Sequence, residues 1–105
     1  MNLLTPRLLL AGALLAAGAA QAQSDADLRA GAYLAGNCAN CHGTAGRSIG
    51  ALPPLAGIPK DGLIKAMRDF RDGRRNATLM HQISKGYTDE QIALMAEYFS
   101  RQKAN

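Results

Sequence analysis

The feature that most constrains this chain is the pentapeptide Cys38-Ala39-Asn40-Cys41-His42, which holds the only two cysteines among 105 residues. Two thiols separated by two residues on a tight helical turn can each form a thioether to one vinyl group of a haem. The imidazole that follows them can then reach the iron. A histidine directly after C-x-x-C is rare by chance, so the pattern predicts a domain built around one covalently attached haem.

Three other interpretations of the two cysteines are weaker. A disulfide oxidoreductase also uses C-x-x-C, but in a βαβ setting. A structural zinc site needs four ligands, and Cys38, Cys41, His42 and His81 are the only Cys and His residues available. A disulfide between Cys38 and Cys41 would close too short a loop to stabilise much. A haem-free thiol or zinc protein therefore stays as a rival, in which both cysteines remain free for alkylation or metal.

The start of the chain predicts a signal peptide. Arg7 precedes an apolar run over residues 8–20, and Ala20-Gln21-Ala22 has the small-x-small pattern of a signal peptidase site. The run is shorter than the roughly 20 residues that cross a bilayer, so an uncleaved anchor is the less favoured alternative. We expect cleavage after Ala22, export to the periplasm and a single domain over residues 23–105.

Size and charge agree with a cofactor protein rather than a nucleic-acid binder. The formal net charge of +4 comes without interleaved basic and aromatic residues, so it is weak evidence for nucleic acid. Domains this small bury a modest fraction of their surface and usually need a disulfide, a metal or another cross-link. A covalently held haem would complete such a core.

Hydrophobic periodicity predicts an all-α domain. We expect three main helices, over about residues 25–35, 60–73 and 89–102, the last preceded by a capping box from Thr88 to Gln91. No alternation of apolar and polar residues suggests a strand. The elements therefore define a small helical domain with long connections.

Two irregular stretches separate these helices. Residues 44–59 are rich in Gly and Pro, and Gly73 to Tyr87 could include one short helical turn from Leu79 to Ser84. Long loops of this kind are uncommon in a compact domain unless they serve a purpose such as wrapping a ligand. The obvious ligand is the haem.

The sixth iron ligand has four candidates, Met67, Met80, Met95 and His81. Met67 and Met95 fall on apolar helix stripes, where methionine usually fills the core. Met80 lies between two helices and is the expected ligand, with His81 as the alternative. A thioether stabilises ferrous iron and raises the potential, whereas bis-histidine ligation lowers it. An open sixth position, as in a gas sensor or a peroxidase-like enzyme, is the rival of another class.

Two further groups could support the site. A backbone carbonyl between Leu52 and Gly57, which we expect to be that of Pro54, could accept the second ring N–H of His42 and fix its orientation. Arg74 and Arg75 lie close to Met80 in the sequence and could steer an acidic partner or pair with a haem propionate. The charge-rich stretch that contains these two arginines is otherwise typical of a solvated helix face.

Together these motifs resemble class I cytochromes c. The likeness covers the N-terminal helix, C-x-x-C-H, a PPLAG-like loop, a methionine loop and the C-terminal helix, which is nearly the whole expected mature chain. It implies the class I cytochrome c fold, one haem c, and His42 and Met80 as axial ligands. It also implies a contact between the first and last helices, where Gly31 lets Tyr98 or Phe99 approach closely.

Within that family the chain is similar to the cytochrome subunit of flavocytochrome c sulfide dehydrogenase. Four segments carry this narrower likeness: Ala77 to Met80, Ile83, Lys85 to Thr88 and Ala96 to Phe99. It implies that an FAD-containing subunit oxidises sulfide and passes electrons singly to this haem, which relays them to another carrier. No catalytic residue is then expected in this chain. A free soluble cytochrome c that donates to an oxidase is the alternative.

Overall fold

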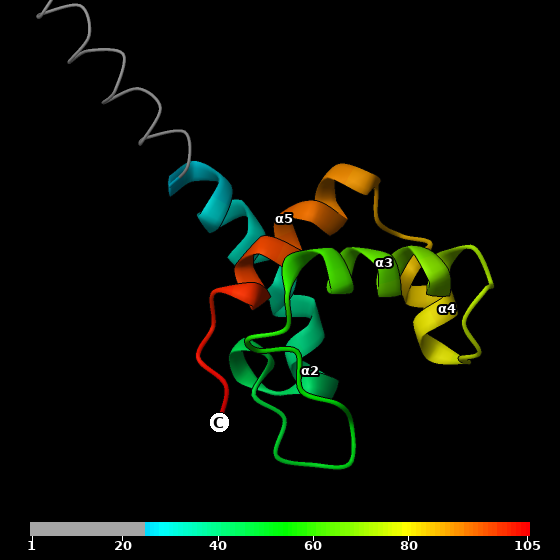
Figure 1. Cartoon of the computed structure of the whole chain (residues 1–105), viewed down its shortest axis with the longest axis horizontal. Coiled ribbons are helices and arrows are strands. Elements are labelled where there is room, and N and C mark those ends of the chain that lie inside the picture. Colours follow the sequence, from blue (N-terminus) through cyan, green and yellow to red (C-terminus); the bar gives the residue numbers. More distant parts are fainter. Residues whose placement is uncertain (1–24) are drawn as a thin grey trace, which may run out of the picture.

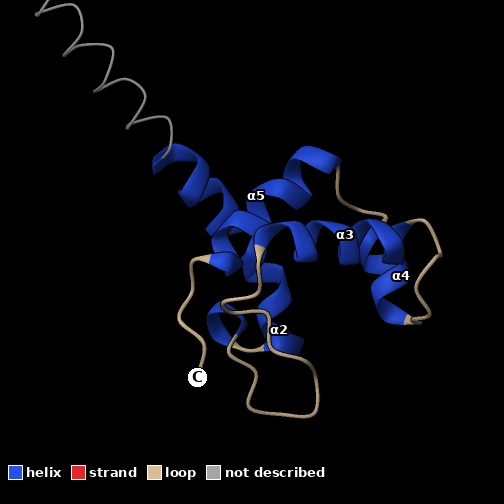
Figure 2. Ribbon diagram, viewed as in Figure 1, coloured by secondary structure: helices blue, strands red, loops and turns tan. Residues whose placement is uncertain are grey.

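The structure is a computed structural model that describes residues 25–105 (Figure 1). The predicted signal peptide, residues 1–22, lies outside this range. Between residues 25 and 105 the chain forms helices and no strands, which confirms the all-α prediction (Figure 2). No helix in this part of the chain is long and apolar enough to cross a membrane.

The three main helices predicted from the sequence are present, together with shorter ones. The described elements are a helix over residues 25–35, η1 (Gly36–Cys38), α2 (Ala39–His42), η2 (Thr44–Gly46), α3 (Lys60–Arg71), α4 (Leu79–Ser84) and α5 (Asp89–Ser100). Both α3 and α5 end two residues before the expected boundary. Gly73 follows the end of α3 with φ 76°, a conformation that glycine adopts without strain.

The last helix begins at the predicted capping box. The hydroxyl of Thr88 accepts a hydrogen bond from the Gln91 amide at 3.1 Å, and the Gln91 side chain accepts one from the Thr88 amide at 3.0 Å. These bonds satisfy two backbone donors that the first helical turn leaves free. α5 is therefore held in place directly after the segment that carries α4.

The core lies where α3, α5 and the first helix meet. It consists of Ala35, Leu63, Ile92, Met95, Ala96 and Phe99, all buried. The partly buried Met67 packs against this cluster, as expected for a core-filling methionine. In Figure 1, α5 crosses the first part of α3 at an angle, with α2 and its loop below them and α4 at the far end of α3.

The contact between the first and last helices depends on a glycine. A Cβ at Gly31 would lie 2.4 Å from the carbonyl oxygen of Leu94 and 3.2 Å from Cβ of Tyr98, so a side chain has no room there. The close approach of Tyr98 that the family resemblance implied is confirmed. Phe99 instead packs against Gly46 in the loop, 2.9 Å from where a Cβ of Gly46 would lie.

Candidate haem site

The cysteine-histidine motif lies on two consecutive helical turns. Cys38 is the last residue of η1, and Cys41 and His42 end α2, where Gly43 turns the chain with φ 83°. Both thiols are free; Cys38 is half-buried against the core and Cys41 is exposed. Burial raises the pKa of the Cys38 thiol, and the neighbouring Cys41 raises it further. The two thiols therefore lie near each other on consecutive helical turns and form no disulfide.

The His42 ring is oriented by the loop that follows it. Its Nδ1 lies 2.7 Å from the carbonyl oxygen of Pro53. A carbonyl oxygen only accepts hydrogen bonds, so Nδ1 carries the proton and Nε2 keeps a lone pair free for a metal. The expected type of contact is present, made by a neighbouring residue.

The expectation that Pro54 supplies this carbonyl was wrong. The amide of Leu55 donates to the carbonyl oxygen of Gly46 at 2.8 Å. In a trans peptide the N–H and the C=O point in opposite directions, and no peptide bond among the described residues is cis. The carbonyl of Pro54, in the same peptide as the Leu55 amide, therefore faces away from Gly46. The preceding carbonyl, that of Pro53, is the one that His42 reaches.

Sequence reasoning missed Gly46, the residue that anchors this loop. Gly46 is buried with φ 74°, and its carbonyl accepts bonds from the amides of both Leu55 and Ala56. The next residue, Gly57, donates its amide to the carbonyl of Phe99 in the core at 2.9 Å. A glycine a few residues after C-x-x-C-H was the only available signal. The loop is thus fixed through its backbone to α5.

Met80 lies on α4, within the short helical turn that the sequence allowed for. Its side chain is half-buried. The neighbouring Ser84 is fully buried, and its hydroxyl points at the sulfur of Met67 at 3.7 Å. Met67 is therefore occupied in packing between α3 and α4, whereas no side chain within residues 25–105 makes a hydrogen bond to the Met80 sulfur.

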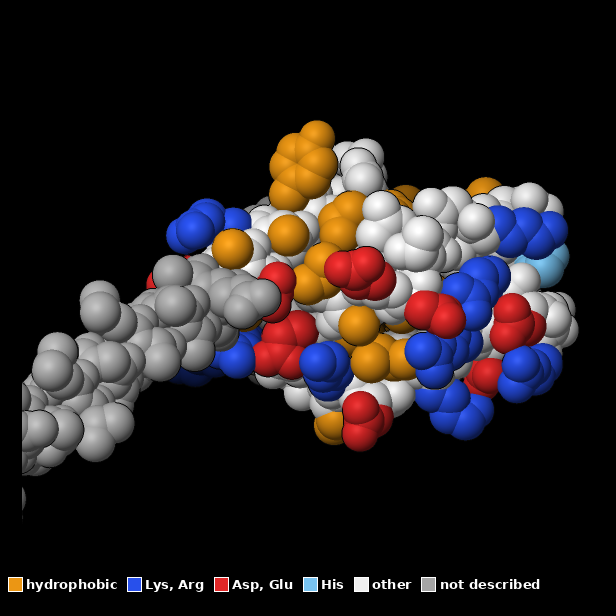
Figure 3. All heavy atoms as spheres, turned by 90° about the horizontal axis from the view of Figure 1, so that it is seen from above, with side chains coloured by type: hydrophobic (Ala, Val, Ile, Leu, Met, Phe, Trp, Pro, Cys, Tyr) orange, Lys and Arg blue, Asp and Glu red, His pale blue; other side chains and the backbone are white. Residues whose placement is uncertain are grey.

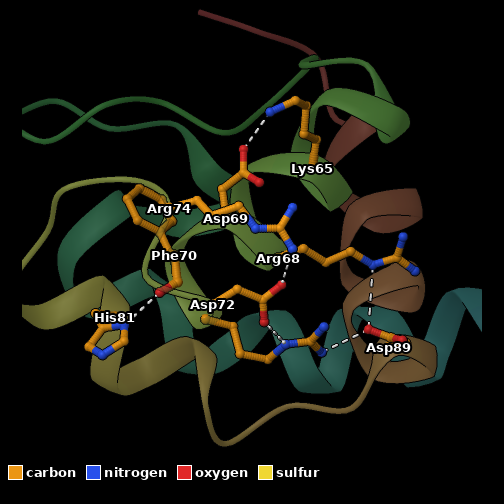
Figure 4. Close-up of polar contacts among 9 residues, drawn as sticks. Lys65, Arg68, Asp69, Phe70, Asp72, Arg74, His81 and Asp89 are labelled. Atoms are coloured by element: carbon orange, nitrogen blue, oxygen red, sulfur yellow. Dashed lines mark hydrogen bonds and ion pairs between the residues drawn. The ribbon is translucent and has the colours of Figure 1, made fainter.

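His81 faces the end of α3 rather than solvent. Its Nδ1 lies 2.7 Å from the carbonyl oxygen of Phe70, as Figure 4 shows. Gly73 lies against the same ring, because a Cβ there would be 3.8 Å from Cε1 of His81. Although Met80 and His81 are adjacent in sequence, they point in different directions from α4.

The charged face of α3 is largely neutralised by its own neighbours. Arg71 binds Asp89 at 2.7 Å and Arg74 binds Asp72 at 2.8 Å, while the guanidinium of Arg75 lies 4.7 Å from the centre of the Phe70 ring. The hydrogen bond from Arg71 holds the pKa of Asp89 below its ordinary value. Acidic and basic side chains alternate over this surface in Figure 3, which agrees with a solvated helix face.

The residues present fit a haem. Cys38 and Cys41 offer two free thiols, His42 offers Nε2, and Met80 offers a thioether, which are the donors that a c-type haem uses. Four large apolar side chains on the flanking segments are exposed: Ile49 by 98%, Leu52 by 46%, Leu79 by 69% and Ile83 by 43%. An apolar macrocycle would cover side chains of this kind. Within residues 25–105 no three His, Cys, Asp or Glu side chains converge as they would around a bare metal ion.

Comparison with known proteins identifies the family. The cytochrome c family model matches residues 28–103. The chain is 44% identical over 69 residues to the cytochrome subunit of sulfide dehydrogenase from Chlorobaculum tepidum, covering 66% of this chain and 63% of that protein. It is 38% identical over 81 residues to cytochrome c-554(548) from Halomonas halodenitrificans, covering 73% of this chain and 98% of that protein.

A third relative, cytochrome c4 from Pseudomonas aeruginosa, is 38% identical over 83 residues, which cover 78% of this chain and 41% of that protein. The chain thus spans less than two thirds of the sulfide dehydrogenase subunit and of cytochrome c4, but nearly all of cytochrome c-554(548). The similarity to a sulfide dehydrogenase subunit that the sequence motifs indicated is confirmed. The chain therefore belongs to the cytochrome c family and is an electron-transfer protein with covalently attached haem c.

Proposed function

We propose that this chain is a periplasmic one-electron carrier whose haem is bound through Cys38 and Cys41, with His42 and Met80 as axial ligands. The observation that carries the proposal is the 2.7 Å contact between Nδ1 of His42 and the Pro53 carbonyl. It leaves Nε2 as the free nitrogen of a histidine that directly follows Cys41, on the two consecutive helical turns that carry both thiols. That is the donor arrangement that proximal haem ligation requires.

Met80 is the best candidate for the other axial position by its surroundings. Met95 is buried in the core, and the sulfur of Met67 accepts the Ser84 hydroxyl. The His81 imidazole is turned to Phe70 at the end of α3. Among these three methionines Met80 is the remaining soft donor, and it lies on the short helix α4 within the irregular stretch from Gly73 to Tyr87.

The haem would supply a one-electron redox couple, and the residues of this chain would set its reduction potential. The Pro53 carbonyl fixes the His42 ring and raises the basicity of its Nε2. A thioether on the opposite side favours the ferrous state and raises the potential. A filled sixth position favours electron transfer over ligand binding or catalysis, so no acid–base residue is needed.

An optical spectrum of the oxidised and reduced protein, compared with that of Met80→Ala, tests the ligation. We expect a weak far-red band from methionine-to-ferric-iron charge transfer that disappears in Met80→Ala. The matched controls Met67→Leu and Met95→Leu should keep it. A covalent haem without that band, or a band unchanged in Met80→Ala, would transfer the assignment to His81 or to an open, ligand-binding iron.

We propose that the electron donor is an FAD-containing subunit that oxidises sulfide, and that a further carrier accepts the electron. Support comes from the 44% identity to the cytochrome subunit of sulfide dehydrogenase. Purification from the native host should recover a flavoprotein with this chain, and added sulfide should reduce the haem of that complex. Recovery of the cytochrome alone, unreduced by sulfide, would contradict this assignment.

The second candidate is a free carrier that donates to an oxidase or another acceptor. It is favoured by the match to cytochrome c-554(548), because 98% of that protein aligns with this chain and its name includes no partner enzyme. Under this alternative the purified protein stays alone, and an oxidase-containing membrane fraction reoxidises it.

Export and domain extent are part of the same proposal. The apolar run and the small-x-small pattern at Ala22 support cleavage to give a domain of residues 23–105. The intact mass of the periplasmic protein should equal that of residues 23–105 plus one haem. A mass that retains residues 1–22 would contradict cleavage.

A further inference from the structure

The short helix that carries Met80 has little of its own to hold it. α4 spans six residues, Leu79–Ser84, too few for a helix to be stable by itself in water. It packs on α3, and Ser84 is its one buried residue. The orientation of α4 therefore depends on its packing against α3 and on the polar contacts between the two helices.

Two polar contacts join α4 to α3. Nδ1 of His81 donates to the carbonyl oxygen of Phe70 at 2.7 Å, and the hydroxyl of Ser84 donates to the sulfur of Met67 at 3.7 Å. Phe70 lies in the last turn of α3, and its carbonyl also accepts a longer hydrogen bond, at 3.3 Å, from the Gly73 amide that follows the helix. The His81 bond is the stronger of the two, because a carbonyl oxygen is a better acceptor than a thioether sulfur.

The helical wheel of α4 shows what these contacts control. At about 100° per residue, Ser84 lies between Met80 and His81, about 40° from the first and about 60° from the second. The burial pattern agrees: Ser84 is buried, Met80 and His81 are half-buried, and Gln82 on the opposite side is exposed. Fixing the direction of His81 therefore fixes the rotation of α4, and with it the direction of Met80.

We propose that His81 is a positioning residue: its hydrogen bond to the Phe70 carbonyl sets the rotation of α4 and directs the Met80 thioether. The inference rests on the proposed function, because it concerns the ligand that Met80 supplies. Figure 4 shows the imidazole of His81 directed at the backbone of Phe70. Gly73 follows the same helix end, and a Cβ there would lie 3.8 Å from Cε1 of His81, an ordinary van der Waals distance.

The test uses the holoprotein and four variants. His81→Asn keeps a donor near the position of Nδ1, whereas His81→Gln places its amide near Nε2 and His81→Phe keeps only ring volume. Gln82→Ala, an exposed change on the same helix, is the control. The measurement is the affinity of ferric protein for free imidazole, which displaces the methionine and abolishes the far-red band.

We expect His81→Phe and His81→Gln to bind imidazole about fivefold more tightly, the effect of losing one hydrogen bond, with a lower reduction potential. His81→Asn and Gln82→Ala should stay within about twofold of the wild type. If His81→Phe yields no holoprotein, the Asn and Gln variants decide the question. Equal affinities for those two, or a fall in melting temperature without a change in affinity, would overturn the inference.

The same experiment separates this inference from the proposed function. A wild-type protein without a far-red band, or a band that survives Met80→Ala, shows that Met80 is not the ligand and overturns both. A band that Met80→Ala removes, combined with normal imidazole affinity in His81→Phe and His81→Gln, overturns only the positioning role.

Discussion

The His42 side and the Met80 side of the candidate haem site each contain a histidine that is hydrogen-bonded to a backbone carbonyl, but the two sides are attached to the rest of the domain in different ways. His42 and His81 each place Nδ1 2.7 Å from a backbone carbonyl eleven residues away. For His42 the carbonyl, that of Pro53, belongs to a loop. For His81 the carbonyl, that of Phe70, belongs to the end of a helix. This bond orients the proposed ligand His42 itself on one side. On the other side it orients His81, which is next to the proposed ligand Met80 in the sequence.

The supports behind these bonds are unequal. The His42 loop is fixed by backbone bonds from Leu55 to Gly46 and from Gly57 to Phe99, which join it to the core. α4 instead packs on α3 through side-chain contacts, and Ser84 is its one buried residue. Segments with few buried contacts open at low free-energy cost. We therefore expect the Met80 side to open more easily than the His42 side.

The largest expected difference in stability between the two sides comes from replacing one glycine on each side, Gly46 and Gly86. Gly46→Ala should lower the free energy of unfolding by about 3 kcal/mol, because it combines a left-handed backbone with an overpacked site. A Cβ there would lie 2.9 Å from both the Ala56 amide nitrogen and Cδ1 of Phe99. Denaturant unfolding of the oxidised holoprotein measures the loss.

Gly86→Ala provides the matched change on the other side. A Cβ at Gly86 would lie 3.4 Å from the carbonyl oxygen of Ile83, close to ordinary contact. We expect a change below about 1 kcal/mol, the scale of a tolerated glycine replacement. Losses of equal size at Gly46 and Gly86 would contradict the claim that the His42 side is the more rigidly built.

The His42 side was largely predictable because its chemistry is contiguous in sequence. Cys38, Cys41 and His42 follow one another on a short helix, so local spacing alone brings them together. Which of the two carbonyls, Pro53 or Pro54, bonds to His42 could not be predicted from the neighbouring sequence. It depended on where the Leu55 amide points, and that is set by its bond to Gly46 across the loop.

The Met80 side could be predicted only by elimination. The pattern placed Met67 and Met95 on core stripes and left Met80 as the expected ligand, but no sequence signal pairs His81 with Phe70 or Ser84 with Met67. Those contacts depend on how residues 72–78 return α4 against α3, a tertiary arrangement that periodicity does not encode. The helix itself was foreseen only as a short turn.

A smaller effect is expected from Ser84→Ala. The hydroxyl of Ser84 is buried and donates to a weak acceptor, the sulfur of Met67. Removing it should cost at most about 1 kcal/mol of stability and tighten imidazole binding by about twofold, less than His81→Phe. Ser100→Ala is the control, because that hydroxyl bonds Glu97 near the end of α5, away from α4. An unchanged imidazole affinity in Ser84→Ala would show that this contact does not orient Met80.

The smallest effect concerns Glu97, which joins the start of α3 to the end of α5 on the His42 side. Its carboxylate lies 2.7 Å from Arg101 and 3.2 Å from Lys60, and these two cations, Arg101 first, lower its pKa. A carboxylate with a lowered pKa stabilises the fold above the ordinary Glu pKa of about 4.3, and the contribution disappears as pH falls through the lower folded value.

Glu97→Gln should therefore lower stability at pH 7 by less than about 1 kcal/mol, because the pair is partly exposed. The difference from the wild type should close as the solution is acidified from about pH 5 to about pH 3. Denaturant unfolding across this range measures it. In an Arg101→Gln background the effect of Glu97→Gln should shrink, since the main partner is gone. A difference that stays constant from pH 7 to pH 3 would show that packing, rather than charge, links these helix ends and makes the His42 side rigid.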